Sequence, residues 1–318
     1  MKLAINVEPS QWAEPFLDVV FNCGLNIVEK EKAEVLVMPA SEITAEDLES
    51  GLKIIALEKT DGGNIVFKNV LKHKSVTRYI TPYNYNSFEL HNIPCVDGRF
   101  FSTLLSHNLE PQDPDYLIDE KDYNKIKEGW NFLHYFRLRE ILSLETDELF
   151  QKNDQRPIDV FFAGRVDYDD KEGTRKSAGI ISEHRKKCAE VLESMTDCET
   201  LIVKGKHLGL KAYNQIICHS KVVVSPWGWG EPCYRDYEAI LAGCILIKPL
   251  TNFIKSSCGM FENTYCIWTN PDFSNLENDV RLALRNFGNT RYKRKANREN
   301  LVKRVEALPL IVRDCLTV

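Results

Sequence analysis

The first half of the chain alternates short apolar runs with polar stretches that carry apolar residues at helical spacing. This alternation is typical of a parallel sheet whose strands are connected by helices. A longer charged region at 123–149 also has apolar residues at roughly helical spacing, which predicts a helix. We expect strands at residues 2–7, 34–38, 53–57, 76–80 and 93–96, and helical or crossover segments at 16–23, 42–48 and 66–73.

A polar run at 151–157, QKNDQRP, separates this half from a second one. It has no large apolar residue and ends in proline, as interdomain linkers do. A second alternation follows it directly. Its expected strands are 159–162, 200–203, 221–224, 244–247 and 263–268, and its expected helices are 182–195, 212–218, 276–287 and the terminal segment from 291. The pattern predicts an α/β protein with two Rossmann-like domains, residues 1–152 and 153–318.

Composition narrows the class of protein. The chain has 318 residues, enough for two domains, with 43% hydrophobic and 27% charged residues. The net charge of −5 argues against general binding to nucleic acid. The ten cysteines form no C-x-x-C pair, which favours a reducing compartment. No window has the roughly 20 apolar residues of a membrane span, and the N-terminal apolar segment is too short for a signal peptide. We expect a cytoplasmic protein.

The stretch 221–249, KVVVSPWGWGEPCYRDYEAILAGCILIKP, carries the clearest chemical signal. It predicts a strand, a glycine-rich loop, a helix and a second strand, an order that builds phosphate sites at the carboxyl edge of a parallel sheet. No Gly-Lys-Ser/Thr triplet follows the loop, so it is not a P-loop. The glycine spacing also excludes a dinucleotide fingerprint.

Within this stretch, RDYEAILAGCI at 235–245 resembles the donor-site signature of exostosin-like glycosyltransferases. The resemblance implies the two-domain GT-B fold, with a nucleotide-sugar donor bound in the second domain. It assigns Glu238 to the donor ribose, the preceding loop to the base and the helix start to the phosphates. Glu231 and Glu238 are similar to the paired glutamates of retaining enzymes, but their spacing is one residue short. The stereochemistry of transfer therefore stays open.

Two places are expected to hold the donor phosphates. Gly164 and Arg165 follow a predicted strand, where backbone N–H groups and a guanidinium can meet an anion. Arg235 stands near a predicted helix start and shares a helix face with Glu238, three residues on. The alternative for Arg235 and Glu238 is an internal ion pair on a core helix. For Gly164 and Arg165 it is a turn or a surface ion pair.

Further donor contacts are expected around these residues. Trp227 and Trp229 have flat rings that suit a base or a sugar. We expect one of them to meet the donor and the other to pack in the core, and we take Trp227 as the contact, next to Gly228. Tyr234 is an equally good candidate. Lys204 follows a predicted strand and is a further candidate for the cleft.

Two other basic segments are less specific. The run HRKK at 184–187 lies on a predicted amphipathic helix and is expected to be a solvated face. Arg175 and Lys176 fall in a polar loop that is a candidate to cover the diphosphate.

An inverting transferase needs a base that takes the acceptor proton. Glu8 and Asp61 each follow a predicted strand of the first domain, where side chains point into an α/β crevice, and we take these two as candidates for the base. His91 and Asp97 lie near later strand candidates. Each of the four has the alternative role of a cap or turn former.

No metal or other cofactor is expected. Asp167, Asp169 and Asp170 contain an Asp-x-Asp spacing, but they follow Gly-Arg in a loop, where a solvated turn explains them. The histidines show no i, i+4 pair of the zinc type.

The sequence thus predicts a metal-independent glycosyltransferase, a hexosyl- or pentosyltransferase that serves polysaccharide biosynthesis. Its donor is expected to be a UDP- or GDP-sugar, with a CMP-sugar left open, and its acceptor a hydroxyl of a glycan or related molecule. Two alternatives remain. One is a nucleotide-sugar epimerase or hydrolase on the same fold, and the other is a non-catalytic sugar-nucleotide-binding subunit.

Overall fold

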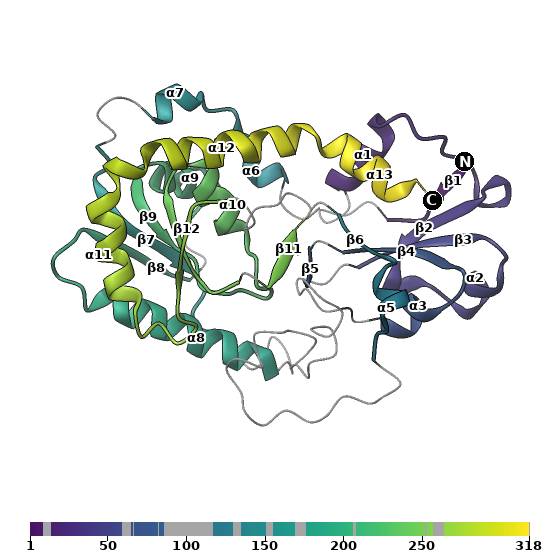
Figure 1. Ribbon diagram of the computed structural model, residues 1–318, viewed down its shortest axis with the longest axis horizontal. Coiled ribbons are helices and arrows are strands. Elements are labelled where there is room, and N and C mark those ends of the chain that lie inside the picture. Colours follow the sequence, from purple (N-terminus) through teal and green to yellow (C-terminus); the bar gives the residue numbers. More distant parts are fainter. Residues whose placement is uncertain are drawn as a thin grey trace.

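The structure is a computed structural model that describes residues 1–8, 14–58, 65, 67–81, 83–85, 117–129, 135–150, 155–168, 176–205, 208–251, 253–256 and 264–317. Two parallel five-stranded sheets, one in each half of the chain, organise it (Figure 1). The predicted alternation of strands and helices is confirmed in both halves.

The first sheet has the order β1-β2-β3-β4-β6, and its strands are all parallel. Its strands are β1 (Leu3–Ile5), β2 (Val35–Pro39), β3 (Lys53–Leu57), β4 (Val76–Thr81) and β6 (Ile126–Glu128). The helices of this half are α1 (Glu14–Asn22), α2 (Ala45–Glu49), α3 (Lys68–Lys72) and α5 (Glu120–Tyr123). The strand expected at 93–96 lies outside the described residues.

The long helix expected over 123–149 is wrong in part. The chain forms β6 there, and then two short helices, α6 (Tyr135–Leu142) and α7 (Thr146–Leu149). Ile126 pairs in register with Tyr79 of β4 and is buried at the edge of the sheet. Strand pairing and burial therefore override the helical spacing of these apolar residues.

The second sheet has the order β12-β10-β9-β7-β8, again with every pair parallel. Its strands are β7 (Ile158–Gly164), β8 (Thr200–Lys204), β9 (Ser220–Val224), β10 (Ile245–Pro249) and β12 (Cys266–Thr269). The helices of this half are α8 (Lys176–Glu193), α9 (Leu210–Cys218), α10 (Tyr234–Leu241), α11 (Leu276–Asn286), α12 (Arg291–Glu306) and α13 (Leu308–Leu316).

The second sheet reverses its winding at its first strand. β7 lies between β8 and β9, so the chain moves to one side of β7 and then to the other. In the first half, an isolated parallel bridge joins Leu3 of β1 to Ile27 on the side away from β2. Ligands of open α/β sheets bind outside the carboxyl ends of the strands at such a reversal. The carboxyl end of β7 is therefore the first place to look for a site.

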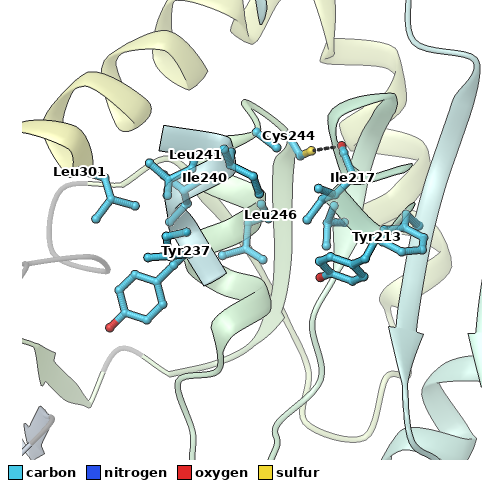
Figure 2. Packing of buried hydrophobic residues seen from close by; sticks show 14 of the residues in the cluster. Tyr213, Ile217, Tyr237, Ile240, Leu241, Cys244, Leu246 and Leu301 are labelled. Atoms are coloured by element: carbon cyan, nitrogen blue, oxygen red, sulfur yellow. Dashed lines mark hydrogen bonds between the residues drawn. The ribbon is translucent and has the colours of Figure 1, made fainter. Parts of the chain in front are cut away.

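The second sheet is buried on both faces, which explains its continuous apolar strands. On one face, Phe161 and Val223 pack with α9, α10 and α12, and on the other, Phe162 and Val222 pack with α8 and α11. Figure 2 shows the first cluster: Tyr237, Ile240 and Leu241 of α10 lie with the side chains of α9 and β10. These contacts hold α10 against the sheet.

The described residues join the two halves in several places. The chain crosses back along α12, and α13 ends beside α1 and the N-terminus (Figure 1), with Val312 and Leu316 in the core of the first half. β5 (Tyr83–Tyr85) pairs antiparallel with β11 (Ile254–Ser256). Lys255 lies 3.6 Å from the carboxylate of Glu128.

The boundary expected between residues 152 and 153 stays a prediction, but three helices do not follow it. Leu138 and Ile141 of α6 belong to the core of the second half, and α7 contacts α12. In the other direction, α13 packs on the first half. In the described parts of the chain, no helix has both the length and the apolar character to cross a bilayer.

Candidate functional site

Helix α10 begins at the carboxyl edge of the second sheet, and a buried ion pair fixes its start. The carboxylate of Asp236 accepts a hydrogen bond from the backbone N–H of Cys233, the residue before the helix, at 2.8 Å. The same carboxylate lies 3.0 Å from Nζ of Lys248 on β10, and both side chains are fully buried. The ion pair anchors the first turn of α10 to the sheet.

Three buried arginines hold the other end of α10. The carbonyls of residues 241–243 have no partner within the helix, since they belong to its last turn. Arg298 donates to Leu241 O, Arg156 to Ala242 O at 2.9 Å and Arg294 to Gly243 O at 2.6 Å. Cations at this end also interact favourably with the helix dipole.

Gly243 ends α10 in a conformation that requires glycine. Its φ is +71°, in the left-handed region that side chains disfavour. A Cβ atom built on it would lie 2.4 Å from Cζ of Phe150. The glycine therefore permits both the turn into β10 and the close approach of the phenyl ring.

A cavity of about 440 Å³ lies where β7 and β8 end and α10 begins. Its position is the one predicted by the reversal at β7. Its lining residues are Ala163, Gly164, Arg165, Tyr168, Arg185, Val203, Gly205, Leu208, Tyr213, Gly228, Trp229, Gly230, Pro232, Cys233, Tyr234, Arg235 and Glu238. Six of the predicted donor contacts are among them: Gly164, Arg165, Gly228, Tyr234, Arg235 and Glu238.

Arg235 is the most unusual group in this cavity. Its side chain is 9% exposed, and its Nε and Nη1 have no hydrogen-bond partner in the described structure. A Cβ on Gly164 would lie 2.9 Å from its Nη2, so the glycine makes room for the guanidinium. Burial alone would lower the pKa of Arg235, but neighbours including Tyr213, Cys233 and Glu238 raise it above its ordinary value. The group stays charged, and its Nε and Nη1 are left to donate hydrogen bonds to an anion beside it.

Glu238 lies one turn further along α10, is 1% exposed and lines the same cavity as Arg235. Residues three apart share a helix face, as expected for this pair. Tyr213, from the start of α9, is also buried at this wall, with its ring 5.6 Å from that of Phe161. The cavity thus combines guanidinium donors, a carboxylate acceptor and aromatic rings.

The aromatic side of the cavity differs from the prediction. Trp227, expected to contact the donor, is 0% exposed and does not line the cavity. Its indole Nε1 donates to Thr251 Oγ1 at 3.2 Å, and its ring stacks on His184 at 5.0 Å. Trp229 lines the cavity, with its ring 5.0 Å from Tyr168 in an edge-to-face contact. One tryptophan is in the core and one at the cavity, but the two are exchanged relative to the prediction.

Two other described candidates, Lys204 and Glu8, do not line the cavity. Lys204 is exposed and forms an ion pair with Glu193 at 2.6 Å, because its side chain turns toward α8. Glu8 is exposed after β1 in the first half. Asp61, His91, Asp97 and Arg175 lie outside the described residues, as does the side chain of Lys176.

The expectation of a solvated face at 184–187 is wrong for two of its four residues. His184 and Arg185 are buried, while Lys186 and Lys187 are exposed. The signal was present in the helical spacing: Ile181, Cys188 and Leu192 form the buried stripe of α8, and residues 184 and 185 fall on it. The charge of the run concealed this periodicity.

His184 is held neutral under the cavity floor. Its Nε2 accepts a hydrogen bond from the backbone N–H of Trp227 at 3.3 Å, which requires an unprotonated nitrogen. Burial first, and then the charges of Arg185, Lys248 and Lys187, lower its pKa to about 3. The neutral ring therefore supports the loop that carries Trp227 and Trp229.

The described residues contain no candidate metal site, because no three His, Cys, Asp or Glu side chains among them are placed to hold an ion. The expectation that no metal is required stays a prediction.

Comparisons with known proteins identify the fold. No protein-family model matches the sequence, and no curated protein matches it. Among solved structures, a glycosyltransferase from Rickettsia africae is similar, with a TM-score of 0.51 and 12% identity over 99% of this chain and 96% of that one.

Two further structures are similar over most of both chains. HepE of Anabaena, solved in complex with UDP-glucose, has a TM-score of 0.49 and 10% identity, with 99% of each chain covered. The trehalose-6-phosphate synthase OtsA has a TM-score of 0.48 and 9% identity, with 96% of this chain and 75% of that one covered. The chain therefore has the two-domain α/β fold of GT-B glycosyltransferases, as predicted.

Proposed function

We propose that the protein is a glycosyltransferase that binds a nucleotide-sugar in the cavity at the start of α10 and transfers the sugar to a hydroxyl acceptor. The observation that carries the proposal is Arg235. It is a buried guanidinium with two unpartnered nitrogens, beside a helix start, at the reversal of a parallel sheet. This combination suits a phosphate-bearing ligand.

The charge of the cavity supports a diphosphate. Its charged lining among the described residues consists of three arginines, Arg165, Arg185 and Arg235, and one glutamate, Glu238. The excess of positive charge matches the dianionic diphosphate of a UDP- or GDP-sugar better than the single phosphodiester charge of a CMP-sugar. Glu238 is proposed to accept hydrogen bonds from the ribose hydroxyls, and Trp229 or Tyr234 to contact the base or the sugar.

The proposed reaction is a displacement at the anomeric carbon with inversion. A carboxylate of the first half, Glu8 or Asp61, takes the proton of the acceptor hydroxyl. The acceptor oxygen bonds to the anomeric carbon, and the bond from that carbon to the diphosphate oxygen breaks with its electron pair. Arg235 and the N–H groups at the start of α10 stabilise the negative charge on the leaving nucleotide.

The setting of the enzyme is part of the proposal. The eight cysteines that the structure describes are free thiols, which supports a reducing, cytoplasmic location. An exostosin-like enzyme without a metal requirement, acting on a glycan hydroxyl in polysaccharide biosynthesis, remains the form of the function that we favour.

A nucleotide-sugar screen tests the function. UDP-, GDP-, CMP- and ADP-sugars are added to the wild type, to Glu238→Gln and to Glu193→Gln, a control carboxylate that is half-exposed and pairs with Lys204. One donor class should raise the thermal midpoint of the wild type and of the control. Glu238→Gln should bind that donor about tenfold or more weakly, because a charged hydrogen-bond acceptor is lost.

Two results would contradict the donor site: no nucleotide-sugar stabilises the wild type, or Glu238→Gln binds the donor as well as the wild type does. Product analysis then separates the alternatives. Donor turnover without any acceptor would identify an epimerase or hydrolase. Binding without turnover, unchanged in Glu8→Gln and Asp61→Asn, would identify a non-catalytic subunit.

A further inference from the structure

Arg185 is a buried arginine whose hydrogen bonds hold segments of the cavity wall together. It comes from α8 and is 7% exposed. Its Nε donates to Trp227 O at 3.1 Å, and its Nη1 donates to Arg165 O at 2.9 Å and to Tyr168 Oη at 2.7 Å. One guanidinium thereby connects α8, the end of β7 and the tryptophan loop.

The third nitrogen of this guanidinium, Nη2, does not hydrogen-bond to the described residues of the cavity wall. Nη2 of Arg185 has no hydrogen-bond partner among the described residues, and no carboxylate there pairs with the side chain. A Cβ on Gly228 would lie 3.0 Å from Nη2, so the glycine keeps the space beside it open. Arg185 and Gly228 both line the cavity, so Nη2 lies next to a residue of the cavity wall.

A buried cation in this position is costly unless a ligand completes it. Burial lowers the pKa of Arg185, its interaction with Tyr168 opposes this, and the nearby charge of Arg235 lowers the pKa further. Arg235 and Arg185 are both more than nine-tenths buried and line the same cavity. Nε and Nη1 of Arg235 have no hydrogen-bond partner among the described residues, and the hydrogen bonds of Arg185 use its Nε and Nη1 but not its Nη2. An anion placed between them would satisfy both.

We propose that Arg185 binds the donor diphosphate through Nη2 while its other nitrogens hold the cavity wall. This inference rests on the proposed function. The residue is then both a ligand of the phosphates and a connection between the phosphates and the loop that carries Trp229. Nothing in the spacing of the donor signature points to a residue of α8.

The exposed lysines on the same helix are matched controls. Lys186 pairs with Asp167 at 2.7 Å, and Lys187 is exposed. Neither lines the cavity.

The test compares ligands that differ only in phosphate: uridine, UMP and UDP, or the guanosine series if the screen selects GDP. Their affinities are measured by calorimetry for the wild type, Arg185→Gln, Lys187→Gln and Lys186→Gln. Arg185→Gln should weaken UDP by about 10- to 100-fold, the size expected for a charged hydrogen bond, and uridine by less than about threefold. The two controls should keep the wild-type ratio of UDP to uridine affinity.

Equal weakening of UDP and uridine in Arg185→Gln would overturn the inference, because a purely structural arginine would affect both ligands alike. If wild-type protein binds none of the nucleotides, the proposed function fails together with this inference. If Arg185→Gln does not fold, Arg185→Lys replaces it. A lysine keeps the charge but cannot hydrogen-bond to the cavity wall and to the diphosphate at the same time. The ratio of UDP to uridine affinity should therefore still fall about tenfold. An unchanged ratio would count against the proposal.

Discussion

The two ends of α10 carry buried arginines in opposite circumstances. At the C-terminal end, Arg156, Arg294 and Arg298 donate to the last carbonyls of the helix. At the N-terminal end, Arg235 and Arg185 line a cavity and retain guanidinium nitrogens without partners. The side chains are the same and the burial is similar, but the use of the donors differs.

This difference distinguishes arginines that stabilise the fold from arginines that are available to bind a ligand. A buried charge that is hydrogen-bonded recovers its desolvation cost within the protein, whereas one without partners recovers it only from a ligand. Removing Arg235 and removing Arg298 should therefore have opposite consequences for stability. The predictions below follow this contrast, from the largest expected change in the free energy of unfolding to the smallest.

Arg298→Met should cost the most stability. Its guanidinium donates to Leu241 O, Leu144 O and Ile141 O, the last at 3.1 Å, and joins α6, α10 and α12. The substitution leaves several buried carbonyls unsatisfied, so we expect the free energy of unfolding to fall by about 3 to 5 kcal/mol. Denaturant unfolding measures it, with exposed Lys303→Gln on the same helix as a control that should change by less than about 0.5 kcal/mol. A loss as small as that of the control would show that the C-terminal arginines are not structural.

Gly243→Ala tests how tightly the C-terminal end of α10 is packed. The alanine adds both the backbone strain of a positive φ and a clash with Phe150, and we expect a cost of about 2 to 4 kcal/mol. Gly51→Ala is the matched control, with φ +81° and nothing within 4 Å of the added Cβ. It should cost only about 1 to 2 kcal/mol, the backbone term alone. Equal losses in thermal unfolding of the two variants would refute the role of Phe150.

His184 predicts a pH dependence on the cavity side. Its folded pKa of about 3 lies below its ordinary 6.5, so the unfolded chain binds the proton more readily. Its contribution to stability is complete above about pH 6.5 and is lost as the pH falls toward 3, by at most about 1.4 kcal/mol per pH unit. His184→Gln keeps an acceptor but does not titrate, so its stability should fall less steeply in this range. Parallel slopes for the two proteins would contradict a neutral buried histidine.

Much of the fold was accessible from the sequence. Four of the five strands expected in the first half, and all of those in the second, correspond to observed strands, because parallel buried strands are continuous apolar runs with polar helices between them. The fifth, at 93–96, lies outside the described residues. β6, expected to be part of a helix, is short and lies at a sheet edge, where pairing with β4 and not local pattern decides its structure. The pairing of β5 with β11 joins segments far apart in the chain, which no local pattern reports.

The residues of the site were predicted less completely than the fold. Gly164, Arg165, Arg235 and Glu238 were found because strand ends and a helix start locate the cavity by topology alone. Which of Trp227 and Trp229 faces the cavity depends on which face of the glycine-rich loop packs on His184. The sequence does not indicate this orientation, because glycines allow many backbone conformations. Arg185 was missed because charge was given more weight than its position on the buried stripe of α8.

The most direct test of the contrast, and of the cavity as a nucleotide site, is a paired measurement on Arg235→Met. Free energy of unfolding and UDP affinity are determined on the same preparation, beside the wild type and Arg298→Met. We predict that Arg235→Met unfolds within about 1 kcal/mol of the wild type, or more stably, since an unpartnered buried charge is removed. Its affinity for UDP should fall by about 10- to 100-fold. A variant that loses as much stability as Arg298→Met and binds UDP as tightly as the wild type would contradict the account.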